Sequence, residues 1–458
     1  TNPLKKWVKP YCQGNFEYLA VAVAAPYIVV RAIGDWFFIA SVDVEFLRPV
    51  MTSLFRAEIA RQSEQDLDGL IPVNPELLLD NNDEAIQAYA RAFTLQPDDE
   101  VSRIALENLL IDYLEIGDPI RERFAEYHYI RGKALAERNY LEKALLEFRR
   151  GLVLTPRSRE GRLLFASIYD LLDFRSKYLT ELKVLRDLGY NDREVADMIE
   201  IEESLQQDAL SIRFDISQYD LERQRFTVGL YSLKGDMIHF HAESDLAEYF
   251  RHLLLRFDKI DITGSVSNAG NFGEAFGNAR DSGVDYFLIF SANEGNRYFT
   301  VEWQLFSGAT GALLSEYSVL RTGNNRVTDA LAAAADRVQK IMPVYAWILQ
   351  RRFDEAIIDL GFVDGVAVED ELLIVRRESF DYRHDKLGFD YSDSDVLGTL
   401  KINEVDELIS LGTIVRNPFF DLINPGDRVV YPAENLEEAL QSDRMLPDDL
   451  YRTILKIR

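Results

Sequence analysis

Apolar residues recur at helical spacing in the first half of the chain. In the stretch Asn82–Pro97, the residues Ala85, Tyr89 and Ala92 fall on one helical face, and a proline follows them. Residues 139–156 repeat this layout. Both stretches therefore predict helices that bury one face and end at a proline.

Small and aromatic residues in the second stretch indicate how such helices pair. Ala144, Phe148 and Gly151 share one face, and Gly132 lies twelve positions before Ala144. Small residues let paired helices approach closely, and an aromatic ring fills the groove between them. Ala166 follows Gly132 by 34 positions. This layout resembles the tetratricopeptide repeat, a fold that usually offers its concave face to peptides or protein surfaces.

The 34-residue register predicts two successive repeats, residues 125–158 and 159–192. The first clear unit lies 59 positions before the next, so an irregular helix over Glu100–Glu115 must intervene. Ordinary helical hairpins without repeat ancestry are the alternative.

Strand and helix patterns alternate from residue 211. Gly283 follows a helical stretch as a C-cap would, and Ser307–Gly311 indicates a hairpin turn. The predicted order is strand, helix, strand, helix, three strands and a helix, over Arg225–Ser232, Asp245–Arg256, Asp261–Gly264, Phe272–Ser282, Val284–Phe290, Tyr298–Phe306, Leu313–Leu320 and Val327–Met342. This order predicts a compact α/β sandwich.

Short strands separated by glycine turns follow residue 343 and predict a small β-barrel. The strands are expected at Tyr345–Gln350, Glu355–Leu360, Glu371–Arg376, Gly398–Val405 and a last strand that ends at Tyr431.

The N-terminal residues give an ambiguous pattern. Ser41–Phe46 alternates like a strand, yet Gly34–Leu47 also fits a degenerate helix. Tyr18–Val30 is apolar and uncharged but shorter than a membrane span, so we interpret it as buried core, with a membrane segment as the alternative.

Together the patterns predict a multidomain chain of the α + α/β + β class. The predicted segments are 1–65 of uncertain fold, 66–210 with tetratricopeptide-like helical repeats, 211–342 as the α/β domain, 343–434 as the β-barrel and 435–458 as a helical tail.

Composition narrows the choice of partner. The 77 acidic residues outnumber the 51 basic ones, giving a net charge of −26. This charge disfavours nucleic acid and anionic lipid, and it favours basic protein surfaces. Cys12 is the single cysteine, so an intramolecular disulfide is impossible. The chain begins at Thr1, so the sequence leaves open a removed signal and an anchor that contacts the membrane. It also leaves open whether the protein forms homo-oligomers or hetero-complexes.

Three stretches offer candidate chemistry. His239 and His241 share a strand face, as a metal site would require, and His252 lies nearby in the sequence; we interpret them as surface histidines. The loop Asp390–Asp395 lacks the glycine and glutamate of a calcium loop, and we expect a solvated acidic loop. Asn268–Gly277 fits neither nucleotide-binding glycine pattern.

No nucleophile or metalloprotease motif supports catalysis. We therefore expect a protein that is not an enzyme and uses no cofactor and no metal. Because 77 acidic residues make accidental carboxylate pairs plentiful, an uncharacterised hydrolase is a further hypothesis.

The inward positions of the repeats' first helices are the predicted binding face. Spacings of three, four and seven place them together. They are Glu126, Tyr129, Lys133, Glu137, Glu160, Ser167 and Asp170. This mostly acidic face with one aromatic anchor suits a basic peptide or loop, although many exposed faces of this kind bind nothing.

The two later segments carry resemblances of their own. Residues 211–342 resemble the α/β domain shared by the TolB N-terminal and curli-secretion lipoprotein families, through the strand Val284–Phe290 after a helix end and the Gly308–Gly311 hairpin before a long helix.

The last segment is similar to the C-terminal domain of a flagellar outer-membrane ring protein. The resemblance rests on Ala346–Val366, Glu371–Val375 and Asn424–Val429. The shared pattern is a strand, then a turn of the form leucine-glycine-x-x-x-glycine-valine, and near the end the motif glycine-aspartate-x-valine. Glu369 stands where glycine often precedes the aspartate, so the turn chemistry differs.

The combination resembles repeat proteins of the spirochete periplasmic flagellar collar. It implies a periplasmic, envelope-associated scaffold of the flagellar motor, with motor, collar or envelope proteins as partners. A regulator or adaptor of cell-wall synthesis, or of an outer-membrane secretion complex, is the alternative.

Overall fold

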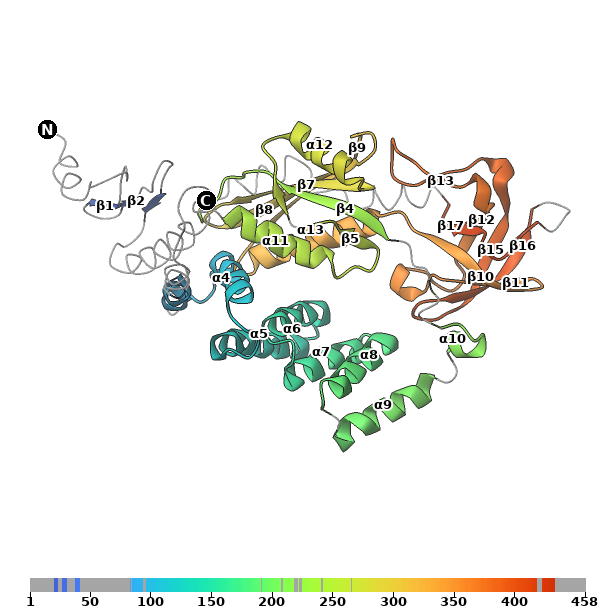
Figure 1. Cartoon of the computed structure of the whole chain (residues 1–458), viewed down its shortest axis with the longest axis horizontal. Helices are drawn as coiled ribbons and strands as arrows, with labels where there is room; N and C mark the ends of the chain where they lie inside the picture. The colour runs from blue at the N-terminus through green and yellow to red at the C-terminus, as the bar shows by residue number, and fades with distance from the viewer. Residues whose placement is uncertain are drawn as a thin grey trace.

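A computed structural model describes three short N-terminal strands, residues 83 and 85–93, and most of residues 96–432 (Figure 1). Within that last range it leaves out residues 191, 207–208, 218–220, 222–224, 240–241, 265 and 418–421. The predicted helical tail lies outside the described residues. No helix among the described residues is long and apolar enough to cross a membrane.

The N-terminal strands form a small antiparallel meander. They are β1 (Ala20–Val23), β2 (Tyr27–Val30) and β3 (Phe38–Ser41). Part of the ambiguous stretch Gly34–Leu47 is therefore strand, since β3 occupies it. The rest of that stretch lies outside the described residues.

Short helices joined by tight turns follow. They are α4 (Glu100–Tyr113), α5 (Pro119–Glu137), α6 (Leu141–Leu154), α7 (Arg159–Leu171), α8 (Arg175–Asp187), α9 (Arg193–Leu205) and the single turn α10 (Leu210–Arg213). Helix α5 packs on α6 and α7 packs on α8, so two helical hairpins follow one another as the 34-residue register predicts.

Gly132 lets the two helices of the first hairpin, α5 and α6, pack closely against each other. A Cβ atom at Gly132 would overlap the ring of Phe148, which is fully buried in the repeat core. Ala144 and Ala166 are likewise fully buried. The small residues and the aromatic ring therefore have the packing roles predicted for tetratricopeptide-like repeats.

Side-chain caps fix where the first helices begin. Ser158 accepts a hydrogen bond from the Gly161 N–H, and Asp192 accepts one from the Val195 N–H, 34 positions on. Helix α5 starts earlier than this register predicts, at Pro119 behind the cap Asp118.

The α/β domain is a mixed sheet in the order β5-β4-β7-β8-β9, with β6 paired to β4. Its elements are β4 (Phe226–Ser232), α11 (Ala242–Leu254), β5 (Ile260–Ile262), β6 (Ser267–Asn268), α12 (Phe272–Ser282), β7 (Tyr286–Glu294), β8 (Tyr298–Ser307), β9 (Leu313–Thr322) and α13 (Arg326–Ile341). Strand β4 is parallel to β5 and β7, while β7, β8 and β9 are antiparallel.

Helices cover both faces of this sheet, and successive side chains of β7 lie alternately on the two faces. Leu288 and Phe290 enter the core that α11 and α13 cover, whereas Phe287 and Ile289 enter a second core under α12. Gly283 ends α12 in the left-handed conformation, as expected.

The last domain is a closed barrel in the order β10-β11-β16-β15-β12-β17. Its strands are β10 (Tyr345–Arg352), β11 (Glu355–Ile358), β12 (Glu371–Val375), β15 (Val396–Val405), β16 (Ser410–Arg416) and β17 (Arg428–Val430), with the small hairpin β13 (Asp381–Tyr382) and β14 (Phe389–Asp390) outside it. The sequence prediction omitted β16. The α + α/β + β fold class is confirmed.

Candidate functional site

The predicted binding residues lie on the first helices α5 and α7. Six of them are exposed: Glu126, Lys133, Glu137, Glu160, Ser167 and Asp170. We call the exposed side of the first helices the first-helix face. Figure 1 shows the repeats in a row beneath the α/β domain, with α9 at the end of the row.

Tyr129 does not belong to this face. It is buried, its hydroxyl lies 2.7 Å from the Thr155 hydroxyl, and its ring fills the space left by Gly151 and Gly161. The aromatic anchor expected from helical spacing is therefore a core residue that joins the two repeats. Its neighbour Ile130 is an apolar residue that is exposed on this helix.

Ion pairs cross between neighbouring first helices. Lys133 Nζ lies 2.6 Å from Glu160 Oε1, which links α5 to α7. Arg159 Nη2 lies 2.9 Å from Glu194 Oε2, which links α7 to α9. Because Lys133, Glu160 and Glu194 are exposed and Arg159 is partly exposed, these pairs contribute little stability.

A buried charge cluster lies on the opposite side, where the repeats meet the α/β domain. His128 Nε2 is 2.7 Å from Glu107 Oε1, and His128 Nδ1 is 2.7 Å from Glu147 Oε2. Arg150 donates to Glu107 at 2.8 Å and to Glu100 at 3.0 Å. The guanidinium of Arg150 also covers the ring of Tyr249 on α11.

The pKa values in this cluster favour its charged form. Burial disfavours a charge on His128, but Glu107 and Glu147 outweigh it and raise the pKa of the imidazole. Burial would raise the pKa of Glu107, yet Arg150 and His128 lower it to about 2. The groups neutralise one another inside the protein, which is typical of a structural cluster.

His239, interpreted from the sequence as a surface histidine, is instead partly buried and joins the repeat region to the α/β domain. His239 Nδ1 lies 2.8 Å from Glu294 Oε2, and His239 Nε2 lies 3.1 Å from Asp99 Oδ2. Asp99 is also the N-cap of α4 and accepts from Ser102. Burial opposes the charge on His239, but both carboxylates raise its pKa well above 6.5.

The metal interpretations gain no support from this arrangement. His241 lies outside the described residues, and His252 lies beside Glu248 at 3.3 Å. In the acidic loop, Asp395 accepts from the Ser392 N–H and hydroxyl and closes a short turn. No group of three or more His, Cys, Asp or Glu among the described residues is placed to hold a metal ion.

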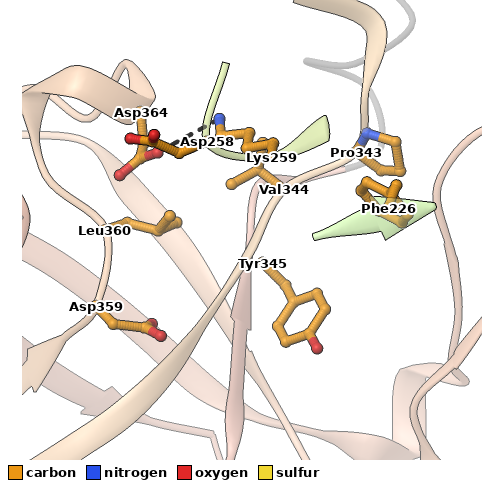
Figure 2. A pocket seen from close by; sticks show the side chains of 9 residues that line it. All are labelled: Phe226, Asp258, Lys259, Pro343, Val344, Tyr345, Asp359, Leu360 and Asp364. Atoms are coloured by element: carbon orange, nitrogen blue, oxygen red, sulfur yellow. Dashed lines mark ion pairs between the residues drawn. The ribbon is translucent and has the colours of Figure 1, made fainter. Parts of the chain in front are cut away.

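A small hollow lies where the α/β domain meets the barrel (Figure 2). Lys259 Nζ is 3.5 Å from Asp364 Oδ1, and Asp359 Oδ1 accepts from the Trp347 N–H at 2.6 Å. Its polar side chains thus bond to the protein itself. The hollow marks a domain junction, with Pro343 lining it.

The barrel also contacts the repeats through the turn between β15 and β16. Helix α8 has no capping side chain of its own, and Glu407 Oε2 accepts from the Ser176 N–H at 2.6 Å. Asp406 Oδ2 accepts from the Leu210 N–H at 3.1 Å and so caps α10. One turn of the barrel therefore supplies caps for two helices of the repeat region.

The face extends further than the sequence prediction. Exposed Ile130, Leu171, Ile201 and Leu205, together with Glu194, belong to the same sides of α5, α7 and α9. Continuing the 34-residue register by one unit would have found Glu194 and Ile201.

Comparisons with known proteins match parts of the chain. A family described as TPASS_0648_2nd, a second domain, matches residues 225–340, which is the α/β domain from β4 to α13. No curated protein matches the chain.

Several solved structures are similar to single domains. The PelC dodecamer from Paraburkholderia phytofirmans is 18% identical and covers 25% of this chain and 83% of its own, with a TM-score of 0.20. The LpoB C-terminal domain from Escherichia coli is 18% identical and covers 21% of this chain and 83% of its own, with a TM-score of 0.20. The TPR2B domain of yeast Sti1, in a complex with pHsp70, is 15% identical. It covers 33% of this chain and 98% of its own, with a TM-score of 0.17. These values are too low to carry an argument about function.

Proposed function

We propose that this chain is a non-enzymatic scaffold that binds other proteins through the first-helix face. The exposure of that face carries the proposal. The second helix α6 is covered in part by the chain itself, because Lys143 bonds to Asp329 and Arg150 packs on Tyr249. The first helices thus offer the accessible surface of the repeats.

The buried titratable groups support a role without catalysis. A catalytic acid or base must reach a substrate proton, which requires an accessible cleft. His128 is fully buried, and both its ring nitrogens are bonded to carboxylates. His239 is likewise held between Asp99 and Glu294. The raised pKa values of both histidines therefore fit a structural role better than chemistry.

Photo-cross-linking tests the binding role. A photo-cross-linking amino acid replaces Ile130 on the face or, as a control, exposed Asp281 at the end of α12. In cells, position 130 should give adducts with one or a few proteins that position 281 does not give. Identical adducts from both positions, or none from position 130, would count against a scaffold that uses this face.

We further propose that the protein acts in the periplasm of a bacterial envelope as a structural component of the flagellar motor or collar. The support is the sequence resemblance of residues 211–342 and of Ala346–Val366 to envelope modules, and their combination with tetratricopeptide-like repeats. Deleting the gene should remove density from motor images and impair motility. Normal motors with altered wall growth or export would favour the alternative, a regulator of cell-wall synthesis or secretion.

A further inference from the structure

The first helices of three consecutive units carry matching rows of side chains. Glu126, Glu160 and Glu194 follow one another at intervals of 34 positions, and all three are exposed. Glu160 and Glu194 are each the second residue of their helix, whereas Glu126 lies in the middle of α5, which starts earlier than the others. One edge of the first-helix face is therefore a row of carboxylates.

Apolar side chains occupy the next rows of the same face. Ile130, Leu164 and Met198 form the second row, in which Leu164 and Met198 are partly buried against the repeat cores. Leu171 and Leu205 follow Glu137 in the last row. Four large apolar side chains on this face are more than half exposed: Ile130 at 61%, Leu171 at 63%, Ile201 at 59% and Leu205 at 64%. Apolar residues grouped beside a polar edge are typical of an interaction surface.

Helical spacing makes these rows continuous. Within α9, Glu194, Met198, Ile201 and Leu205 are separated by four, three and four positions, which places them on one side of the helix. The opposite side of α9 carries Val195 and Ile199, which pack on α8. Met198 is partly buried against the same cluster, whereas Ile201 and Leu205 are exposed and do not belong to it.

We propose that this face binds an amphipathic helix of a partner protein, with basic residues along one flank. The inference rests on the proposed scaffold function and names its partner class. Helix α5 contacts α7, and the pair Arg159–Glu194 joins α7 to α9. At spacings of about 10 Å between neighbouring helices the three span about 20 Å, a length covered by about 13 residues of α-helix. Such a helix can contact the apolar rows with its apolar stripe and the carboxylate row with its basic flank at the same time.

The charge of the face favours a basic amphipathic helix over a second copy of the chain. Two copies that met through this face would bring like-charged glutamate rows together, which is unfavourable. The exposed pairs Lys133–Glu160 and Arg159–Glu194 are weak, so their carboxylates can exchange partners for basic residues of the incoming helix.

The test uses the full-length chain and a synthetic peptide. The probe is a fluorescent leucine–lysine peptide of about 14 residues with the leucines at helical spacing. A scrambled peptide of equal composition controls for simple attraction to an acidic protein. Anisotropy should show at least tenfold tighter binding of the amphipathic peptide, and equal binding of both peptides would overturn the proposal.

Two sets of variants locate the binding. Replacing Leu171, Ile201 and Leu205 by serine should weaken peptide binding at least tenfold. Glu126→Gln, Glu160→Gln and Glu194→Gln together should weaken it severalfold and reduce its salt dependence. A charge-matched control changes exposed acidic residues elsewhere, namely Asp281→Asn, Glu316→Gln and Glu378→Gln, and should bind within twofold of the original chain.

Each remaining outcome is decisive. Unchanged binding in the serine variant, with its folding checked by thermal unfolding, overturns the proposal. Self-association that is lost in the serine variant assigns the face to a second copy instead. A photo-cross-linker at position 201 that reacts within its own chain assigns it to a segment of this protein. Adducts at position 130 with a partner that lacks a basic amphipathic helix leave the scaffold role intact and overturn this inference alone.

Discussion

At the scale of single residues, the same glycine substitution should have opposite effects in two helices. A Cβ at Gly132 would overlap the Phe148 ring, whereas nothing lies within 4 Å of a Cβ at Gly277 in α12. Gly132→Ala should lower the free energy of unfolding by about 1–2 kcal/mol through overpacking. Gly277→Ala should raise it by about 0.5–1 kcal/mol. Urea unfolding measures both, and a stabilised Gly132→Ala variant would contradict the packing role of this glycine.

The buried histidine of α5 predicts a pH dependence. Because the folded-state pKa of His128 is raised, its contribution to stability is complete below pH 6.5 and is lost as the pH rises through the raised pKa. His128→Gln leaves Glu107 and Glu147 with one cation fewer and should lower the free energy of unfolding by about 3 kcal/mol at pH 6.

Unfolding measured from pH 5.5 to 9 checks this expectation. The loss of stability toward high pH should be smaller in His128→Gln than in the original chain. As a control, His384→Gln, at an exposed position between β13 and β14, should leave it unchanged. Equal slopes in the original chain and His128→Gln would show that His128 is not charged in the folded protein.

At the scale of elements, the sequence predicted most helices and strands because local signals determine them. The continuous apolar run at the start of β7 and the cap at Gly283 are visible in the residues themselves. Strand β16 was missed, since Ser410–Arg416 is short and mixes glycine with polar residues. The early start of α5 at Asp118 and Pro119 was also missed, although both are start signals.

The candidate site was predicted in part for a similar reason. Helical spacing correctly placed Glu126 and Glu160 on an exposed side. It cannot tell Tyr129 from Ile130, because which of them is buried depends on the room that Gly151 and Gly161 leave in other helices. The buried charge cluster depends on which domain covers α6, and no local pattern records that contact.

A helix capped by another domain gives a prediction at this scale. Glu407 caps α8, yet its other carboxylate oxygen is buried without a hydrogen-bond partner, and burial raises its pKa. Glu407→Ala should lower the free energy of unfolding by about 1 kcal/mol, since the cap is lost. Glu407→Gln keeps an acceptor and removes the buried charge, so it should be at least as stable as the original chain at pH 7. A Gln variant as unstable as the Ala variant would show that the cap requires a charge.

At the scale of the whole molecule, contacts connect every pair of domains. The repeats bond to the α/β domain through His239 and to the barrel through Glu407. The α/β domain meets the barrel where Phe226 packs against Tyr382. These contacts hold the first-helix face in a fixed relation to the two later domains, which is what a scaffold with several docking surfaces requires. The net charge of −26 acts over the same scale and favours basic partners.

The coupling of domains predicts how the molecule unfolds on heating. His239→Ala leaves Asp99 and Glu294 buried without their cation, and such a loss costs about 3–5 kcal/mol at the contact. Calorimetry should therefore show one transition for the original chain and, for His239→Ala, an earlier separate transition of the repeats. Lys143→Ala removes an exposed pair at the same contact and should keep the single transition, because exposed pairs contribute little. If His239→Ala unfolds in one step at the original temperature, the domains are held together by apolar packing, and the buried histidine bridge is not what couples them.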